Sequence, residues 1–389
     1  MDFRLSDEQR AAQEMAHDFA ARELRPIALE CDLAHAFPPD LLGKAAALGL
    51  NSMGIPPEYG GAGFDHVTQA LIYEELAWGC AGLAATIMGT MLAAYPVMLG
   101  GTPEQQQVWL TRLADPRGTY GAIAITEAGA GSDAAAMTTR AIREGDFYRL
   151  RGAKRFITNG GIGDVYVVFA TLDPGQGGKA ICAFLVDGHA PGVSAGKKER
   201  KIGLCASHTG EILLDDVRVP AADRLGPEGA GFGAVLRFFQ ASRPMVGAVA
   251  VGIARAAYEA ALAYAFEREQ FGSVVFKNQG VSFPLADMAI QIEAARNLVH
   301  KACWLLDTGQ DAGLAGSFAK CFATDMAMQV ADAAVQVLGG YGLMHEYHVE
   351  KWLRDAKVLQ IVEGTNQIQR LIVNDYQARA MARRPAAKA

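Results

Sequence analysis

The sequence of 389 residues is 51% hydrophobic and 20% charged, a globular composition with enough length for two or three domains. The formal net charge of −6 argues against nucleic acid as the main partner, because a phosphate backbone favours a basic protein surface. Six scattered cysteines with no Cys-x-x-Cys pair indicate reduced and mostly buried thiols. The first ten residues contain no apolar signal core, so we expect a cytoplasmic protein, or a mitochondrial matrix protein if the chain is a processed form.

The first region, residues 1–121, is predicted to be helical. Apolar residues recur at three- and four-residue steps from Met15 to Ile27, and a second helix is expected over residues 40–50 with Gly49 near its end. The segment 77–103 carries no charge and is long enough to cross a bilayer. Because glycines and Pro96 interrupt it and no Lys or Arg flanks it closely, we predict buried helices and no membrane span, with membrane insertion as the alternative.

The second region, residues 122–233, changes to the periodicity of β-structure. Strands are expected over residues 121–126, 165–171, 180–186 and 211–214, and residues 147–158 are interpreted as a hairpin that turns at Gly152-Ala153. Glycine-rich turns separate these runs. The pattern predicts an all-β domain, either a sandwich or a barrel.

The third region, residues 234–389, is predicted to be helical again. Three alanine-rich stretches, at residues 246–268, 284–306 and 315–338, are apolar nearly all round. Helices of this kind are buried in a bundle or in a subunit interface. The chain therefore reads as a helical domain, a β-domain and a helical bundle.

Two motifs of the β-domain are weak signals when taken alone. The run from Thr126 to Asp133 is a glycine-rich turn that exposes backbone N–H groups to a flat or phosphate-bearing cofactor. It fits a Rossmann pattern only loosely, because no acidic residue ends a strand about twenty residues later. The run from Lys154 to Gly161 is a strand followed by a turn. Each motif on its own reads as an ordinary surface turn or hairpin end.

Two further motifs lie in the helical bundle. Arg268 and Phe271 are expected on one face at the end of a long helix, an arrangement suited to a pyrophosphate and a ring, or simply to packing. Glu363 follows the apolar pair Ile361-Val362 and precedes Gly364, which is expected to end the helix, so that Thr365 or Asn366 could cap the next one. A carboxylate at such a break can project into an apolar cleft, where desolvation raises its pKa as a general base requires, although a solvated glutamate is the alternative.

Taken together, these features resemble the acyl-CoA dehydrogenase family, especially its straight-chain and medium-chain types. The similarity runs over nearly the whole chain, and four motifs in this order carry it: Thr126-Glu127-x-Gly129-Ala130-Gly131-Ser132-Asp133, Ile157-Thr158-Asn159-Gly160, Arg268-x-x-Phe271-Gly272, and Arg354-Asp355-Ala356-Lys357 through Glu363-Gly364-Thr365. The resemblance implies a mainly α fold with a central β-domain: a helical domain (1–121), a β-barrel-like domain (122–233) and a C-terminal four-helix bundle (234–389).

The resemblance also implies FAD as the cofactor. The flavin would lie against Ile123, Ile125, Thr126, Gly131, Ser132, Phe156, Ile157 and Thr158. The adenine and pyrophosphate of a neighbouring subunit's FAD would lie against Arg268, Phe271, Gln279, Gln336, Val337, Gly339 and Gly340, and Thr365 and Gln367 would also touch FAD. Such shared sites imply an obligate oligomer, a homotetramer built as a dimer of dimers. No metal is expected, since the two histidines of His345-Glu346-Tyr347-His348 have the wrong spacing for a zinc site.

The reaction implied by the resemblance is removal of two hydrogens from an acyl-CoA. Glu363 takes the α-proton, the β-hydrogen leaves as hydride to flavin N5, and a trans-2-enoyl thioester results. The implied electron acceptor is an electron-transfer flavoprotein. An oxidase of the same fold that uses oxygen, and an inactive helical scaffold, are the alternatives.

The substrate contacts implied are Ser132, Gln240, Arg243, Gly364, Met88 and Val362. Met88 stands where the medium-chain type has a glutamate, and the surrounding residues 83–94 contain no cation, which disfavours a dicarboxyl-CoA substrate. The chain departs from the family pattern in having Phe156 for tryptophan, Ala128 for proline, Gln240 for aspartate and Val362 for tyrosine. Val362 opens space near the reacting carbons, so branched or ring-bearing acyl groups are a further hypothesis.

Overall fold

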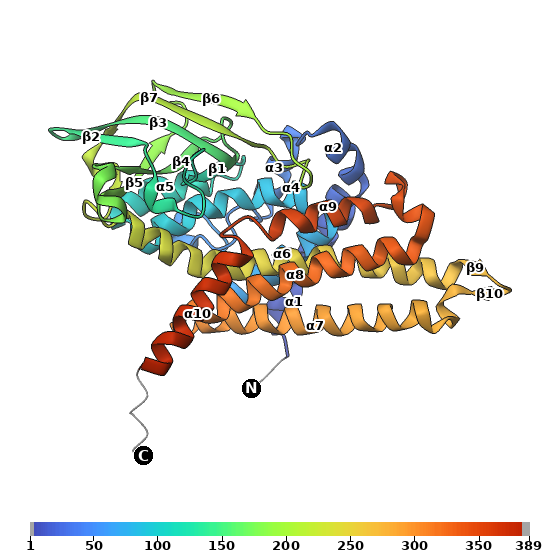
Figure 1. The fold of residues 1–389 in the computed structure, drawn as a ribbon. Helices are drawn as coiled ribbons and strands as arrows, with labels where there is room; N and C mark the ends of the chain where they lie inside the picture. The colour runs from blue at the N-terminus through green and yellow to red at the C-terminus, as the bar shows by residue number, and fades with distance from the viewer. Residues whose placement is uncertain (1–3, 383–389) are drawn as a thin grey trace, which may run out of the picture. The chain divides into compact units, whose positions relative to one another are not determined.

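The computed structural model describes residues 4–382 and divides the chain into two compact units, Met1–Phe239 and Gln240–Ala389 (Figure 1). Helices and a β-sheet make up the first unit, and the second unit is almost entirely helical. The long helix α6 (Gly231–Glu267) begins in the first unit and continues into the second.

The helices of the first unit follow the predicted apolar spacing. They are α1 (Asp7–Phe19), α2 (Ala28–Ala34), α3 (Pro39–Ala47), α4 (His66–Gly100) and α5 (Pro103–Leu113). Ser6 starts α1 with a capping box, since its hydroxyl accepts from the Gln9 N–H and the Gln9 side chain accepts from the Ser6 N–H. A π-helical turn (Ala20–Leu24) and a 3-10 turn (Arg25–Ile27) carry the chain into α2.

The uncharged segment predicted to be buried forms most of α4. Among the described residues, α4 and α6 are long and apolar enough to cross a membrane, but 78% and 67% of their most apolar windows are buried within the protein. Burial of this extent is what the core helices of a folded domain show, so length and composition are weak grounds for a membrane span.

Eight strands form one sheet in the first unit: β1 (Gly121–Ala124), β2 (Arg140–Glu144), β3 (Phe147–Thr158), β4 (Val165–Thr171), β5 (Ile181–Asp187), β6 (Val193–Lys198), β7 (Thr209–Pro220) and β8 (Arg224–Leu225). The order is β6-β7-β3-β2-β4-β5-β8, and β1 pairs in parallel with β4. The four runs expected as strands are all strands, whereas β2, β6 and β8 are additional.

The predicted hairpin at Gly152-Ala153 is wrong. β3 is one continuous strand, which pairs along its length with β7, and the turn lies earlier, at Gly145-Asp146 between β2 and β3. Gly152 instead marks a register shift, and a Cβ there would lie 2.6 Å from the Thr139 hydroxyl. A glycine inside a strand therefore signals a bulge here and not a reversal.

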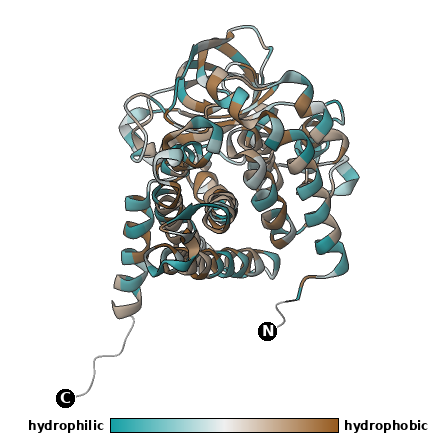
Figure 2. Ribbon diagram, turned by 90° about the vertical axis from the view of Figure 1, so that its right-hand side faces the viewer, coloured by the Kyte–Doolittle hydropathy of each residue, from teal (hydrophilic) through white to brown (hydrophobic). Residues whose placement is uncertain are grey.

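One apolar core serves both halves of this sheet. It includes Tyr148 and Leu150 of β3, Val168 of β4, Phe184 of β5 and Val217 of β7, all of them buried. Because strands from both ends of the hydrogen-bonded order share this core, the sheet curls on itself as a barrel-like domain does. Hydrophobic residues recur along its strands in Figure 2.

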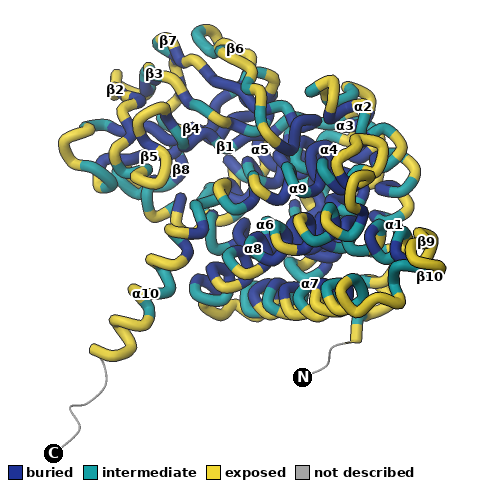
Figure 3. Tube along the Cα trace, turned by 45° about the vertical axis from the view of Figure 1, so that its right-hand side comes forward, coloured by how far each residue is buried: buried dark blue, intermediate teal, exposed yellow. Residues whose placement is uncertain are grey.

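In the second unit, α6 packs with α7 (Gln279–Asp307) and α8 (Gly313–Leu338), while α9 (Val349–Leu359) and α10 (Asn366–Ala382) lie against α8. The close approach of the long helices depends on small residues. A Cβ on Gly247 of α6 would lie 2.8 Å from Val299 of α7. The outer faces of α7 and α10 are exposed (Figure 3). The three predicted alanine-rich helices are confirmed as parts of α6, α7 and α8.

Two local expectations in this unit are wrong. Helix α9 ends at Leu359, several residues before Gly364, so Glu363 lies in a non-helical turn. Helix α6 ends at Glu267, and Arg268 and Phe271 flank the two-residue strand β9 (Glu269–Gln270), which pairs with β10 (Ser273–Val274). The two residues therefore do not share a helix face, because the chain turns back where the helical spacing assumed continuation.

Candidate active site

In the first unit, the predicted flavin motifs lie side by side. The N–H of Arg155, in β3, donates to Thr126 O at 2.8 Å, which joins the loop after β1 to the strand that leads to Ile157 and Thr158. A tight turn closes the loop, with Glu127 and Ala130 exchanging backbone hydrogen bonds of 3.0 and 3.2 Å. Two segments 30 residues apart in the sequence thus form one continuous surface.

The predicted flavin-facing residues differ in exposure. Ile125 and Ile157 are buried, Ile123, Thr126 and Thr158 are half-buried, and Gly131 and Ser132 are exposed. Phe156 is 59% exposed and adopts a left-handed backbone conformation with φ +58°. A large aromatic ring held at the surface in a strained conformation is typical of a ligand-binding position.

A buried ion pair fixes this loop. The Lys154 ammonium donates to Glu127 Oε1 at 2.8 Å and to Ile125 O at 2.9 Å, and both side chains are almost fully inaccessible to solvent. Glu127 also accepts from the Thr138 N–H, the Thr138 hydroxyl and the Thr139 N–H. Burial alone raises the pKa of Glu127, but Lys154 and these donors outweigh it and lower the pKa to about 2. Burial lowers the pKa of Lys154 to about 8 against the attraction of Glu127.

Asn159 ties the same region to helix α4. Its buried side-chain amide donates to Thr86 O and to Gly121 O, both at 3.1 Å, and so connects α4 with the start of β1. The contact is close enough that a Cβ on Gly89 would lie 2.5 Å from the Asn159 amide nitrogen. Met88, the neighbour of Gly89 and a predicted substrate contact, is buried on α4.

In the second unit, Glu363 stands in a turn between α9 and α10. Its φ of +56° is in the left-handed region, and Gly364 follows with φ +84°. Thr365 caps α10 as predicted, because its hydroxyl accepts from the Ile368 N–H at 3.3 Å. The Glu363 N–H has no acceptor within residues 4–382. The residue therefore presents a carboxylate and a free backbone donor together.

The Glu363 carboxylate is held by residues of α6 and α8. The Ser242 hydroxyl donates to Glu363 Oε2 at 2.7 Å. Burial raises the pKa of Glu363, while Ser242, the positive charge of Arg243 and that of Lys320 act to lower it. Arg243 is itself buried, and burial lowers its pKa while Glu363 raises it. The structure thus brings the predicted residues Arg243 and Glu363 together, with Gly364 next in the chain; Arg243 is buried, and Glu363 and Gly364 are half-buried.

The residues predicted to bind adenine and pyrophosphate gather elsewhere in this unit. Arg268 lies over the ring of Tyr341, with 5.8 Å from guanidinium carbon to ring centroid, which places it beside the turn at Gly339 and Gly340. Phe271 is fully exposed, and Gln279, Gln336 and Gln367 are also exposed. Figures 1 and 3 both place the β9–β10 tip and helix α10 at opposite ends of the bundle.

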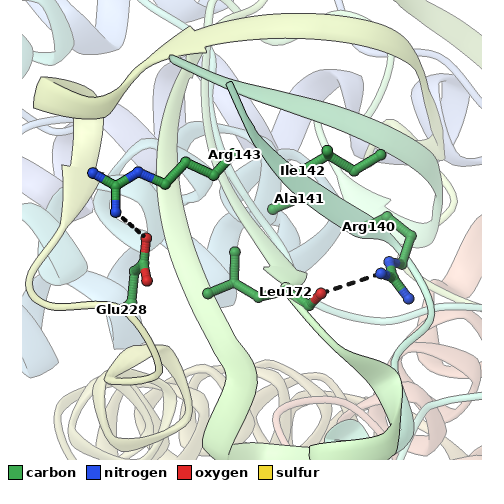
Figure 4. Close-up of a pocket in the computed structure, with 6 residues that line it drawn as sticks. All are labelled: Arg140, Ala141, Ile142, Arg143, Leu172 and Glu228. Atoms are coloured by element: carbon green, nitrogen blue, oxygen red, sulfur yellow. Dashed lines mark hydrogen bonds and ion pairs between the residues drawn. The ribbon is translucent and has the colours of Figure 1, made fainter. Parts of the chain in front are cut away.

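Two cavities within single units lie away from these residues. One, of about 300 Å³, lies beside β2, where Arg143 bonds Glu228 and Arg140 bonds Leu172 O (Figure 4). The other, of about 520 Å³, lies between α7, α8 and α10. Neither is lined by a predicted site residue. Among the described residues, no cluster of three or more His, Cys, Asp or Glu side chains could hold a metal ion, and all six cysteines are free.

Comparison with known proteins identifies the family. Sequence models of the N-terminal, middle and C-terminal domains of acyl-CoA dehydrogenases match residues 6–117, 122–217 and 229–377. An acyl-CoA dehydrogenase of Bacillus subtilis is 44% identical over 96% of this chain and 98% of its own. The chain belongs to the acyl-CoA dehydrogenase family. The resemblance, the fold class and the assignment as an oxidoreductase acting on acyl-CoA are confirmed.

Two further members of the acyl-CoA dehydrogenase family show its range. Cyclohex-1-ene-1-carbonyl-CoA dehydrogenase of Syntrophus aciditrophicus is 42% identical over 95% of this chain and 89% of its own. The crystallised butyryl-CoA dehydrogenase of Megasphaera elsdenii is 40% identical, with a TM-score of 0.95 over 97% of this chain and 100% of its own. Similar chains in the family thus act on a ring-bearing and on a short straight acyl group.

The sequence did not reveal three groups that shape these sites: the Lys154–Glu127 pair, Ser242 and Lys320. Lys320 offered a signal, because it is the only basic residue of the alanine-rich helix α8, and a buried charge requires a buried partner. Ser242 offered none, since a serine inside a helix is unremarkable by itself.

We predict that Lys154→Met destabilises the protein by roughly 3–5 kcal/mol, because it leaves the Glu127 carboxylate buried without its cation. Thermal unfolding would measure this loss, and absorbance of the purified protein would show reduced flavin content. The double variant Lys154→Met/Glu127→Gln should recover part of the stability. A single variant as stable as the parent would contradict the assigned role of the pair.

We predict that Glu363→Gln raises the melting temperature at pH 8. The folded pKa of Glu363 lies above 4.5, so its stabilising contribution is complete below about pH 4.5 and is lost as the pH rises through the folded value. The gain from the substitution should therefore shrink as the pH approaches 4.5. Glu350→Gln is the control, because the pKa of Glu350 is shifted in the opposite direction: Arg354 and His345 lower it against the effect of burial. That variant should lose stability at pH 8, and a similar loss for Glu363→Gln would refute the prediction.

Proposed function

We propose that the protein is an FAD-dependent dehydrogenase that converts an acyl-CoA to its trans-2-enoyl-CoA, with Glu363 as the base that abstracts the α-proton. The observation that carries this proposal is a glutamate with a raised pKa, bonded to Ser242 and beside Arg243. A general base works best when its pKa lies near the working pH, and burial moves a carboxylate in that direction.

The residues present fit FAD in both predicted segments. The turn at Gly129 and Gly131 is open, since a Cβ on either residue would meet no atom within 4 Å, so a cofactor can approach the backbone closely. Phe156 and Phe271 expose their rings, and Arg268 exposes a guanidinium suited to pyrophosphate. When bound, FAD supplies the acceptor for the β-hydrogen and its electron pair.

The protein's own contribution to the reaction is to make the α-proton removable. A thioester α-proton is a weak acid, so the negative charge that develops on the thioester oxygen needs a fixed donor. We assign that role to the unoccupied N–H of Glu363, which lies on the same residue as the base. Exclusion of water around the carboxylate strengthens both interactions.

The separation of the two segments within the bundle supports a shared cofactor. Ser242 and Arg268 are 26 residues apart along α6, which corresponds to roughly 39 Å at ~1.5 Å per residue. This exceeds the length of an extended FAD, so the cofactor near Glu363 and the one near Arg268 belong to different sites. We therefore propose that Arg268, Phe271, Gln279, Gln336, Val337, Gly339 and Gly340 serve the FAD of a neighbouring subunit in a homotetramer.

We further propose an electron-transfer flavoprotein as the acceptor and a cytoplasmic location. Both follow the pattern of the family, and the second also agrees with the bacterial origin of the relatives. The acceptor distinguishes a dehydrogenase from an oxidase of the same fold: substrate should reduce a flavoprotein acceptor under nitrogen, and rapid peroxide formation in air would favour the oxidase.

A second candidate concerns the acyl group. Val362 precedes the base, is 38% exposed and leaves more space than the tyrosine of the medium-chain pattern. The ring-bearing substrate named for the Syntrophus relative makes a cyclic acyl-CoA a candidate beside a short straight one. The absence of a cation from residues 83–94 continues to disfavour a dicarboxyl-CoA.

We predict that Glu363→Gln keeps the yellow flavin spectrum but slows anaerobic flavin bleaching by butyryl-CoA by roughly 10²–10⁴-fold, the usual contribution of a general base. Stopped-flow absorbance measures the rate. Glu293→Gln on the exposed side of α7 is a matched carboxyl-to-amide control and should bleach like the parent. Full bleaching by Glu363→Gln would remove the basis of the proposed function.

We predict that Val362→Tyr lowers kcat/KM for cyclohex-1-ene-1-carbonyl-CoA more than for butyryl-CoA, by on the order of 10-fold in the ratio, because a filled pocket rejects the bulkier group. Steady-state kinetics on both thioesters test this, with Val362→Ala as the control that leaves the space open. Equal losses on the two substrates would count against Val362 as a determinant of acyl size.

A further inference from the structure

A polar cluster on α8 holds the turn that carries Glu363. The cluster consists of Lys320 and Thr324, which lie on one side of the helix at i and i+4, and of the half-buried Asp325, which follows Thr324 in the sequence. Lys320 and Thr324 are completely inaccessible to solvent. Buried polar side chains of this kind need partners within the protein.

Lys320 supplies the first link to the turn. Its ammonium donates to Gly364 O and to Asn366 Oδ1, both at 2.9 Å. Gly364 O also accepts from the side-chain amide of buried Gln369 at 3.0 Å. The carbonyl of Gly364, the residue after Glu363, is thus held by two donors.

Thr324 and Asp325 supply the second link, through Asn366. The two amide hydrogens of Asn366 are donated to Thr324 Oγ1 at 2.9 Å and to Asp325 Oδ1 at 2.7 Å. Asp325 also accepts from Gln360 and from Arg370, each at 2.7 Å. Residues on both sides of Glu363 are therefore bonded to one short stretch of α8.

The turn needs such support, because Glu363 adopts a left-handed backbone conformation. A residue with a Cβ in that region costs on the order of 1–3 kcal/mol and persists only where the surroundings hold it. If the hydrogen bonds to Gly364 O were lost, we expect the turn to relax. The carboxylate and the N–H of Glu363 would then lose their fixed positions.

The ammonium also acts on the carboxylate through its charge. Glu363 faces Ser242 and Arg243 from α6 and Lys320 from α8, and the two cations lower its pKa against burial. Lys320 in turn faces Glu363, Cys321, Asp325 and Arg243. Loss of the Lys320 charge would leave the carboxylate harder to ionise.

We propose that Lys320 is a positioning residue for the base: it anchors the turn that carries Glu363 through Gly364 O and Asn366, and its charge favours the ionised carboxylate. This role rests on the proposed function of Glu363 and adds a group that does not touch the substrate. Burial lowers the pKa of Lys320 to about 8, against the effect of Glu363, so the ammonium keeps its proton at neutral pH.

The test is the pH dependence of anaerobic flavin reduction by butyryl-CoA in Lys320→Met, normalised to FAD-loaded protein. We expect the maximal rate to fall by on the order of 10²-fold, with a smaller change in the half-saturating concentration of butyryl-CoA. We also expect the acid limb of the rate profile to move to higher pH by about one unit. An unchanged rate and an unchanged acid limb would overturn the proposal.

Lys351→Met is the matched control. Lys351 on α9 is equally buried and donates at 2.6 Å to Asp355, four residues along its own helix. Its loss should lower the melting temperature without moving the acid limb. If both lysine variants shift the limb alike, Lys320 acts only through general stability, which contradicts the proposal.

Thr324→Val provides a milder probe in case Lys320→Met does not fold. It is nearly isosteric and removes the Thr324 hydrogen bond to Asn366, so it should slow flavin reduction in the same sense by a smaller factor, on the order of 10-fold. A folded Thr324→Val with the parent's rate would contradict the anchoring of the turn.

The Glu363→Gln variant distinguishes a failure of the proposed role of Glu363 from a failure of the proposed role of Lys320. If Glu363→Gln alone retains fast bleaching, the proposed function fails whatever Lys320 does. If Glu363→Gln abolishes bleaching, Lys320→Met should add little further loss in that background, because it acts through the same carboxylate. A full multiplicative loss in the double variant would show that Lys320 acts independently of the base and would overturn the inference.

Discussion

A glutamate withheld from water but still able to lose its proton is the requirement on which the rest of the second unit depends. Burial raises the pKa of the Glu363 carboxyl and so disfavours the ionised form that a base requires. Full solvation would return its pKa to an ordinary value, too low for a proton acceptor in this reaction. The hydroxyl of Ser242 and the charges of Arg243 and Lys320 lower the pKa of Glu363 against the effect of burial, and so keep it between these two limits.

Glu127 shows what the same side chain becomes when the balance of donors changes. It accepts from Lys154, from the Thr138 N–H and hydroxyl, and from the Thr139 N–H, and its pKa falls to about 2. Glu363 accepts a hydrogen bond only from Ser242 within the described residues, and its pKa rises. A saturated carboxylate is an anchor, since all its lone pairs are engaged. A sparsely bonded one keeps the capacity to take a proton.

The features predictable from the sequence are those that depend on neighbouring residues. The helices over residues 246–268, 284–306 and 315–338 could be predicted because they are nearly apolar all round, and the break in the helical pattern near Glu363 because a glycine follows an apolar pair there. The bulge at Gly152 was misread because a glycine in a strand looks the same whether the chain turns or only shifts register; pairing with β7 decides, and β7 lies about 60 residues later. Lys320 was missed for a similar reason, since its partner Gly364 is 44 residues away.

The proposed base, Glu363, stands in a turn and not inside a helix, and the proposed role of its N–H depends on this. In a helix the N–H of Glu363 would donate to the carbonyl four residues earlier and would be lost to the substrate. Because α9 ends at Leu359 and the chain takes a left-handed step at Glu363, that N–H is released while the side chain points towards Ser242. One residue can then offer both a proton acceptor and an oxyanion donor, which fixes their relative geometry by covalent bonds. The left-handed conformation is unfavourable in isolation, so a turn of this kind requires an external hold, and α8 supplies it through Gly364 and Asn366.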